Sequence, residues 1–331
     1  MPYRDPTPVR ILIYASRSNL IGPVFGQMES IRAVVARRNI ELGLGTALLH
    51  QSGWFVQWVE GPAAAVQQVI DRVAADPRHG NMHVVHDAVA PRQLHDSWSM
   101  AVVQADEMPD DFGRRVAALL HDRERGLHHA PAAVWRLLST PLGHVGAQAH
   151  DDPSLFCRTL VCAADFDESF DLVRWLGGRH RVDVVRRRFA GADTPDVATD
   201  YVDFAEGGLV HRVIAMARNG IRIGLTRAFL ADYGCIVLVR GGDAKRDAQV
   251  LELLCAACDG LLHRPVLLGV GADAASHEPL RRMARGRAMH YLNVDVDDRR
   301  DSAQLWCAIA PVVREFAAPV PMRAVATACA R

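Results

Sequence analysis

Lysine is almost absent from this sequence of 331 residues, because Lys245 is its one lysine and arginine supplies the other basic side chains. Lysine and arginine together number 38, as do aspartate and glutamate, so the formal net charge is zero. A neutral chain argues against a partner that binds through charge alone, such as nucleic acid or an anionic membrane surface. We therefore expect neither of these two partners.

Cysteine is absent from the first 156 residues, and all seven cysteines lie from Cys157 onward. An odd number without a regular framework suits a reducing compartment. No apolar run approaches the roughly 20 residues of a membrane helix, and the first eight residues lack the apolar core of a signal peptide. The sequence therefore predicts a cytoplasmic protein without a membrane segment.

A complete metal site is also missing from the sequence. Cys255 and Cys258 form one CxxC pair, but there is no second pair to complete a zinc site. Because the pair lies on an apolar helical run, we interpret both cysteines as small buried residues.

The length indicates two domains, at an average of roughly 150 residues per domain. In the first domain, apolar and β-branched runs predict strands at 9–15, 44–50, 54–60, 82–89 and 97–104. Helical spacing of apolar residues predicts helices at 24–39 and 63–75. The resulting order, βαββαββ, predicts an α+β, ferredoxin-like domain with a small sheet and both helices on one face.

In the second domain, short apolar runs that predict buried strands alternate with helical segments. The strands are predicted at 155–163, 235–239, 265–269 and 290–294, and the helices at 169–176, 243–262, 278–285 and 302–316. This alternation predicts a doubly wound, mostly parallel α/β sheet that is covered by helices on both faces.

A further helix is predicted at 110–127 and a short one at 134–138, among prolines and glycines that indicate a linker. The predicted organisation is a first domain at 1–127, a linker at 128–152, a second domain at 153–320 and a tail at 321–331.

The first domain carries a distinctive group of side chains in a fixed order. They are Tyr14-Ala15-Ser16 at the end of the first strand, Asn39 at the end of the first helix, the run GWFVQWVEG from Gly53 to Gly61, Asp76-Pro77-Arg78-His79, and Trp98-Ser99-Met100 on the last strand. Each alone would suit core packing, a turn or a solvated surface. Together, from about 9 to 104, they resemble the BLUF family of blue-light sensors that use flavin.

The resemblance implies an isoalloxazine ring held between the two helices, and a role for several residues. Tyr14 would donate an electron and a proton to the excited flavin, and Gln57 would bridge Tyr14 and the flavin and rearrange its hydrogen bonds after light. Asn39 would bind the pyrimidine edge of the flavin. Trp98 and Met100 would lie on the strand that responds to the glutamine.

The cofactor contacts implied by the resemblance also include Ser16, and Arg78 and His79 near the polar tail of the flavin. FAD is the usual flavin of the family, and FMN and riboflavin remain open as alternatives. One departure is visible on the second strand, where Gly45-Thr46 reverses the family's usual Thr-Gly.

The chemistry of the glutamine supports this interpretation independently. A side-chain amide offers both donors and an acceptor, so it can reverse its hydrogen-bond pattern without a change in charge. A buried phenol usually needs a partner, which makes Tyr14 and Gln57 natural neighbours. Two competing arrangements of such a buried network form a plausible bistable element.

Residues 155–316 resemble, in layout more than in identity, a small GTPase domain of the bacterial Ras-like kind. A phosphate-binding loop needs glycines, a lysine and a magnesium-binding hydroxyl. Ser169 stands where the lysine would lie, and Phe170 stands where the hydroxyl would lie. The loop also carries side chains that would repel phosphate, namely Asp165, Asp167 and Glu168.

The guanine-binding residues of that family are missing as well. Val270-Gly271 stands in place of the Asn-Lys pair, and only Asp273 is kept. The aspartate at the strand end near the γ-phosphate is replaced by Met216 or Ala217. We therefore interpret the second domain as a pseudo-GTPase, a degenerate GTPase-like effector that is not an enzyme.

The sequence as a whole predicts a photoreceptor whose output is a changed protein–protein contact. The partner would be an unidentified downstream protein, and a homo-oligomer is expected, for which the helix at 110–127 is a candidate interface. Two alternatives stay open: a light-regulated nucleotide-binding enzyme, and a sensor that uses flavin reduction.

Overall fold

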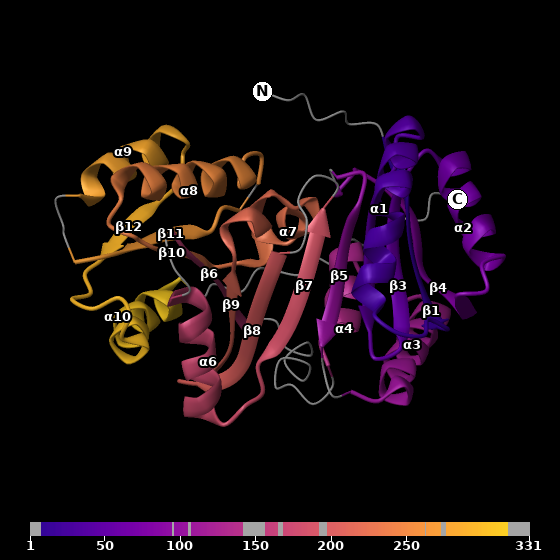
Figure 1. Ribbon diagram of the computed structural model, residues 1–331, viewed down its shortest axis with the longest axis horizontal. Helices are drawn as coiled ribbons and strands as arrows, with labels where there is room; N and C mark the ends of the chain where they lie inside the picture. Colours follow the sequence, from indigo (N-terminus) through magenta and orange to yellow (C-terminus); the bar gives the residue numbers. More distant parts are fainter. Residues whose placement is uncertain are drawn as a thin grey trace. The chain divides into compact units, whose positions relative to one another are not determined.

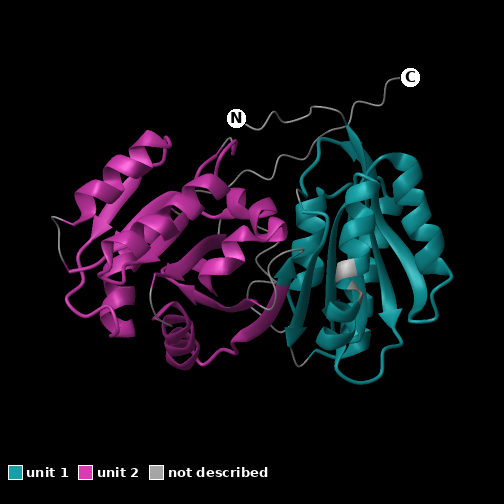
Figure 2. Ribbon diagram, turned by 45° about the horizontal axis from the view of Figure 1, so that its top comes forward, with its two compact units in different colours: residues 1–143, 190–195, 322–331 teal, residues 144–189, 196–321 magenta. Residues whose placement is uncertain are grey.

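The computed structural model of the chain describes residues 8–94, 96–104, 107–141, 156–164, 168–191, 197–261, 263–272 and 276–316. The chain divides into two compact units, which are coloured separately in Figure 2. Unit 1 comprises residues 1–143, 190–195 and 322–331, and unit 2 comprises residues 144–189 and 196–321. The domain boundaries and the tail expected from the sequence stay predictions.

Unit 1 contains a five-stranded sheet in the order β5-β2-β3-β1-β4. Its elements in chain order are β1 (Val9–Ser18), α1 (Val24–Glu41), β2 (Gly45–Gln51), β3 (Trp54–Gly61), α2 (Ala63–Ala74), β4 (His79–Ala90) and β5 (Ser99–Gln104). β3 is antiparallel to both β1 and β2, β4 is antiparallel to β1, and β5 is parallel to β2. The predicted order βαββαββ is confirmed.

Alternation of side chains along each strand gives this sheet two packed faces. On one face, Leu12, Tyr14 and Val59 pack against Val66 and other buried residues of α2. On the same face, Met28 of α1 packs in a second cluster with side chains of β2, β3 and β5, namely Leu48, Phe55 and Met100. The helices α1 and α2 therefore cover one face of the sheet, as predicted.

Two further helices, α3 (Pro109–Glu124) and α4 (Pro131–Ser139), cover the opposite face. Trp54 stacks on Phe112 of α3 with 5.5 Å between ring centroids, and Trp58 lies 6.1 Å from Trp135 of α4. Each helix begins with a proline in its first turn, where the missing N–H costs nothing. Trp58, the residue that follows Gln57, thus contacts α4.

A buried arginine fixes the end of α4. Arg115 of α3 donates from Nη1 to the carbonyl oxygens of Leu137, Leu138 and Thr140, at 2.6, 2.9 and 2.5 Å, and its Nη2 pairs with Glu107. The last carbonyls of a helix have no partner within the helix, so this guanidinium supplies one. The short helix predicted at 134–138 is confirmed, and it is packed against α3.

Unit 2 contains a sheet in the order β12-β11-β10-β6-β9-β8-β7. Its strands are β6 (Phe156–Ala163), β7 (Val185–Gly191), β8 (Val197–Glu206), β9 (Leu209–Met216), β10 (Cys235–Val239), β11 (Val266–Val270) and β12 (Tyr291–Val294). The strands from β12 to β9 are parallel, whereas β8 is antiparallel to both β7 and β9. The predicted mostly parallel sheet is confirmed.

Helices cover both faces of this second sheet, and Figure 1 shows α8 and α9 on one side of it and α6 and α10 on the other. The helices of unit 2 are α6 (Glu168–His180), α7 (Gly224–Ala228), α8 (Ala244–Ala257), α9 (His277–Gly286) and α10 (Ser302–Glu315). Two 3₁₀ turns, η2 (Arg218–Arg222) and η3 (Leu230–Asp232), flank α7. Aspartates cap two of the helices: Asp243 accepts from backbone N–H groups of α8, and Asp301 does so for α10.

Several predicted ends are wrong for identifiable reasons. The prediction ended β1 at residue 15 and started β4 at residue 82, but β1 continues to Ser18, which pairs with His79. The helix predicted at 243–262 ends at Ala257. The strands β7, β8 and β9 were not predicted. In β7, the consecutive arginines Arg186, Arg187 and Arg188 hide the apolar pattern.

A buried ion pair joins β8 and β9. Arg212 and Asp203 are cross-strand partners, and the guanidinium donates to both carboxylate oxygens at 2.7 and 2.6 Å. Both side chains are almost fully buried. Removing one partner from such a pair is costly because the other charge stays in a low-dielectric environment.

We predict that Asp203→Ala destabilises unit 2 by about 3–5 kcal/mol, since Arg212 would keep a buried charge without its carboxylate. Hydrogen exchange of β8 and β9 amides in the full chain measures this change. Asp171→Ala is the control, because the pair between Asp171 and Arg174 is half exposed and its loss should cost under about 1 kcal/mol. Equal effects of the two substitutions would contradict the prediction.

Candidate functional site

The candidate site lies on the α1/α2 face of the unit 1 sheet, where a row of residues crosses four strands. Tyr14 of β1 lies opposite Gln57 of β3, which lies opposite Leu48 of β2, which in turn lies beside Met100 of β5. Because alternate residues of a strand share a face, this register brings together side chains that are far apart in the sequence.

A short hydrogen bond joins the first two members of this row. The Tyr14 hydroxyl donates to Gln57 Oε1 at 2.5 Å. Tyr14 is 0% exposed and Gln57 is 7% exposed. Burial raises the pKa of the Tyr14 phenol above its usual range, with a smaller contribution from the negative charge of Asp76. The phenol therefore stays protonated and keeps its proton available for the glutamine.

The amide nitrogen of Gln57 is available for a hydrogen bond to a ligand. The amide Oε1 accepts from Tyr14, while Nε2 has no hydrogen bond to another described residue. A primary amide nitrogen carries two donors, and buried donors without a partner are costly. Gln57 can therefore offer donors to a ligand on this face while it holds Tyr14.

Asn39, at the end of α1, lies in a second small polar network. Its Nδ2 donates to Thr46 Oγ1 at 3.0 Å and to the Ser97 carbonyl at 2.7 Å, and the Thr46 hydroxyl donates to the same carbonyl at 2.9 Å. Asn39 and Thr46 are buried. The network joins α1 to the start of β5.

Trp98 and Met100 are both buried in unit 1. They belong to the cluster that contains Met28, Leu48 and Phe55. The indole Nε1 of Trp98 is buried and has no hydrogen-bond partner among the described residues. Such a group usually finds a partner when it is buried, so it is a second donor on this face that a ligand or a rearranged side chain can satisfy.

Ser16 and His79 meet at the other end of the face. Ser16 Oγ lies 2.8 Å from Nδ1 of His79, whose ring lies 4.7 Å from that of Phe55 and 6.2 Å from that of Tyr14. Burial lowers the pKa of His79, partly offset by the charge of Asp76. A neutral imidazole with one fixed nitrogen is therefore expected beside Tyr14.

Arg78 lies next to His79 but is held at the surface. Its guanidinium forms a bidentate pair with Asp76, with distances of 2.5 to 3.0 Å, and its side chain is half exposed. Hydrogen bonding to Arg78 lowers the pKa of Asp76 to about 2. Arg78 thus lies at the rim of the face with its charge paired to that of Asp76.

These residues fit a flavin. The face offers apolar side chains for a planar ring and amide groups at Gln57 and Asn39 for the ring's polar edge, and the Arg78–Asp76 ion pair lies at its rim. Ligand sites combine an apolar slot with a few polar groups in this way. The buried indole N–H of Trp98, which has no partner among the described residues, is the structural observation that most directly indicates a missing polar partner.

Sequence reasoning missed two polar residues near the site. Thr46 was noted only for its inverted order, and its hydroxyl contacts Asn39. Glu60, which is buried on the other face, accepts from Trp58 Nε1 and from the backbone N–H groups of Gln93 and Leu94. Burial raises the pKa of Glu60 despite these bonds. The bonds from Thr46 to Ser97 and from Gln93 and Leu94 to Glu60 join segments far apart in the sequence, so no local pattern predicts them.

The nucleotide-binding positions proposed for unit 2 do not assemble into a phosphate site among the described residues. Arg299 bonds to Glu168 and to the Gly241 carbonyl, at 3.4 and 2.7 Å. Asp247 accepts from Arg240 and from the Gly241 N–H, at 3.3 and 2.8 Å. Ligands of open α/β sheets bind outside the carboxyl ends of the strands, and here salt bridges occupy that end of β6 and β10.

The other residues at the expected nucleotide-binding positions are apolar, buried or outside the described ranges. Ser169 is buried, and Phe170 packs against the core. Met216 and Val270 are also buried. The expectations for Asp165, Asp167 and Asp273 fall outside the described residues.

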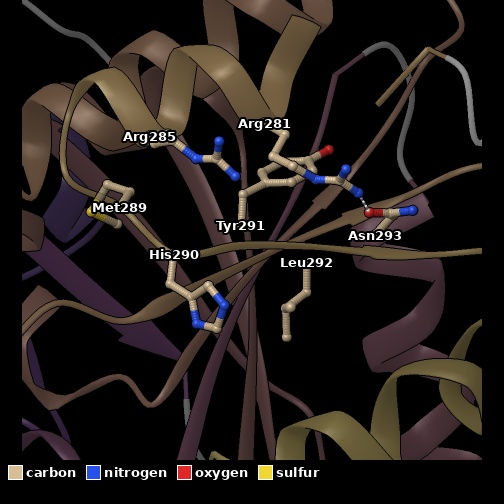
Figure 3. Close-up of a pocket in the computed structure, with 7 residues that line it drawn as sticks. All are labelled: Arg281, Arg285, Met289, His290, Tyr291, Leu292 and Asn293. Carbon is tan, nitrogen blue, oxygen red and sulfur yellow. Dashed lines mark hydrogen bonds between the residues drawn. The ribbon is translucent and has the colours of Figure 1, made fainter. Parts of the chain in front are cut away.

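A cavity of about 360 Å³ lies elsewhere in unit 2, at the edge strand β12. Figure 3 shows Arg281, Arg285 and Asn293 on one side of this strand and His290 on the other. Arg281 is already bonded to Asn293 and Glu278. The cavity is lined by two arginines and a histidine and is therefore basic.

Across the described ranges, no three histidine, cysteine, aspartate or glutamate side chains are placed to hold a metal ion. Among the described helices, none is long and apolar enough to span a membrane. The cysteines Cys255 and Cys258 are buried, as predicted.

Comparison with known proteins identifies the first unit. Residues 9–101 match the family described as sensors of blue-light using FAD, or BLUF. This part of the chain is therefore a BLUF domain.

Individual relatives match the chain over short stretches. Photoactivated adenylate cyclase subunit beta of Euglena gracilis is 35% identical over 74 residues, which are 22% of this chain and 9% of the relative. A subunit beta-like protein of the same organism is 34% identical over 80 residues, which are 24% of this chain and 9% of the relative. The chain thus spans about a tenth of these relatives.

Among solved structures, the dark state of the BLUF protein BlrB is 28% identical, with a TM-score of 0.26. It covers 29% of this chain, and the match covers 74% of BlrB.

One histidine on the candidate face gives a pH prediction. Burial lowers the pKa of His50, which lies beside Phe55, to about 4. The unfolded chain has a histidine pKa near 6.5 and therefore binds more protons between these two values. Stability from the neutral His50 is thus present above about pH 6.5 and is lost as the pH falls toward 4.

We predict that His50→Gln flattens the dependence of unfolding free energy on pH between about 6.5 and 4, because the titrating group is removed. Urea unfolding at a series of pH values measures the slope. An identical slope for the variant and the unsubstituted protein would contradict the prediction.

Proposed function

We propose that the chain is a blue-light photoreceptor in which a flavin, FAD in the description of the family, binds on the α1/α2 face of unit 1. The observation that carries this proposal is the buried hydrogen bond of 2.5 Å between Tyr14 and Gln57. The bond joins a proton donor, the Tyr14 phenol, to the Gln57 amide, whose nitrogen has no hydrogen bond to another described residue. It lies at the place where a flavin ring would bind.

When bound, the flavin supplies a ring that absorbs blue light and then accepts an electron and a proton. Tyr14 holds its phenolic proton in the bond to Gln57 Oε1, and the raised pKa keeps that proton in place in the dark. Gln57 can exchange its acceptor and donor ends without a change in charge. Such an exchange would alter the packing of its neighbours in the row, including Met100.

The other contacts hold and orient the ligand. Asn39 binds the pyrimidine edge, Ser16 and His79 line the far end of the face, and Arg78 attracts the phosphate-bearing tail. Trp98 has a buried donor that a reoriented Gln57 or the flavin can satisfy. Each of these side chains contributes binding or orientation and leaves the light chemistry to Tyr14 and Gln57.

For unit 2 we propose a degenerate GTPase-like output domain that acts through protein–protein contacts. Its mostly parallel sheet with helices on both faces supports a nucleotide-domain layout. The salt bridges of Arg240 and Arg299 at the carboxyl ends of the strands argue against phosphate binding there. The expected partner is a downstream protein of unidentified sequence. We also propose that the chain forms a homo-oligomer and is located in the cytoplasm.

A light-regulated enzyme is the second candidate, because the Euglena relatives are named photoactivated adenylate cyclase subunits. The 74-residue match to one of them covers 22% of this chain. Calorimetry with ATP, GTP and GDP in the presence of magnesium separates the two candidates. Submicromolar binding of any nucleotide would favour the enzyme, and its absence would favour the non-catalytic output.

The absorption spectrum of the purified chain, before and after blue light, tests the photoreceptor. We expect a bound flavin whose band shifts slightly to the red and recovers in the dark. A colourless protein that cannot be reconstituted with FAD, FMN or riboflavin would overturn the proposal. A flavin that only bleaches would instead favour redox sensing.

We predict that Gln57→Leu keeps its flavin but loses the reversible red shift, since leucine preserves the apolar slot and removes the switching amide. Illuminated absorption spectra measure the loss. Gln68→Leu is the matched control, because Gln68 lies exposed on α2, and it should cycle normally. A normal photocycle in Gln57→Leu would refute the assigned switch.

A further inference from the structure

The reversed order Gly45-Thr46 on β2 has a steric cause in this structure. A Cβ atom at position 45 would lie 2.9 Å from the carbonyl oxygen of Leu94 and 3.1 Å from its Cβ. The segment around Leu94 cannot easily retreat, because Glu60 accepts hydrogen bonds from the N–H groups of Gln93 and Leu94. A side chain at position 45 would therefore force the backbone around Leu94 to shift, which favours glycine there.

The threonine at position 46 lies on the face of the candidate site, between α1 and β5. It is 1% exposed, and its Oγ1 accepts from Asn39 Nδ2 at 3.0 Å while donating to the Ser97 carbonyl at 2.9 Å. The family pattern that this domain resembles has the order Thr-Gly, with glycine at the second position. This hydroxyl is thus a feature of this chain in a position where the family pattern offers none.

The hydrogen-bond count of Asn39 then determines which end of its amide is available. A primary amide nitrogen has two donors, and those of Asn39 are taken by Thr46 Oγ1 and the Ser97 carbonyl. A reversed amide would place Asn39 Oδ1 against the Ser97 carbonyl, so that two acceptors faced each other. Asn39 therefore presents only Oδ1, an acceptor, to a ligand.

We propose that Thr46 is a positioning residue that fixes the Asn39 amide, so that Oδ1 accepts a hydrogen bond from the N3–H of the flavin. This inference rests on the proposed function. The pyrimidine edge of an isoalloxazine has one donor, N3–H, between two carbonyl acceptors, so an acceptor-only asparagine selects the N3–H. The flavin carbonyls must then find donors elsewhere on the face.

The same hydroxyl links this edge of the flavin to β5. The Ser97 carbonyl that accepts from Thr46 and Asn39 directly precedes Trp98, and Met100 lies two residues further on. A loosened Asn39 amide therefore also loosens the start of the strand that carries these two side chains. We expect the rate of dark recovery to change together with the flavin contact.

Three substitutions in the full chain test the role of the hydroxyl. Thr46→Val removes it at constant size, Thr46→Ala removes it without adding a second methyl group, and Thr46→Ser restores it. Thr159→Val is the matched control, a buried strand threonine of unit 2. The readouts are the dissociation constant for FAD, the proton resonance of ¹⁵N3-labelled flavin, and the rate of dark recovery.

We expect Thr46→Val and Thr46→Ala to weaken FAD binding roughly threefold to tenfold, as for loss of one buried hydrogen bond. The N3–H resonance should move upfield and dark recovery should change in both. Thr46→Ser and Thr159→Val should stay within about twofold of the unsubstituted protein. Unchanged N3–H resonance and unchanged recovery in Thr46→Val and Thr46→Ala would overturn the proposal.

A measurement on the unsubstituted protein keeps the test independent of folding of the variants. The side-chain amide protons of ¹⁵N-labelled Asn39 should shift little when FAD is added, because both already bond to protein acceptors. A large shift that reports a new bond to a flavin carbonyl would overturn the proposal. If the unsubstituted protein bound no flavin at all, the proposed photoreceptor would fail first, and this distinguishes the two failures.

Discussion

The hydrogen bond between the Tyr14 hydroxyl and the Gln57 amide is the interaction on which the account of the site depends. Antiparallel pairing of β1 and β3 places the two residues opposite each other, and burial keeps the phenol protonated. In a buried site without water, a polar group that loses its hydrogen-bond partner destabilises the fold by about 1–3 kcal/mol. The amide can therefore change partners only when a ligand or another side chain offers a replacement, and this requirement is what makes the pair a plausible switch.

Much of unit 1 could be predicted because its patterns are local. Apolar alternation and helical spacing predict the order of strands and helices, and the joint pattern of Tyr14, Asn39, Gln57 and Trp98 indicates the family. In the structure Tyr14 and Gln57 pair across β1 and β3, Trp98 packs in the cluster on the same face, and Asn39 lies near the end of α1. What each of these residues does for a flavin stays a prediction, since the family match identifies the domain and not the role of a side chain.

The contacts that the sequence did not predict join segments that are far apart. The steric need for Gly45 comes from Leu94, which Glu60 holds in place. The end of α4 is set by Arg115 of α3. Local spacing carries no information on such contacts, because they depend on how the elements pack. In unit 2, the arginines that hide β7 show the same limit, since their side chains alternate between exposed and buried positions.

The most direct test of the Tyr14–Gln57 switch is a light-minus-dark infrared difference spectrum of the flavin-loaded chain, with ¹³C in the side-chain amide carbon of glutamine. The account predicts an isotope-sensitive amide carbonyl band that changes on illumination, reverses in the dark and is absent from a chain without Gln57. A spectrum in which flavin bands change while no glutamine band responds would contradict it, and the bond of 2.5 Å would then be a fixed part of the core.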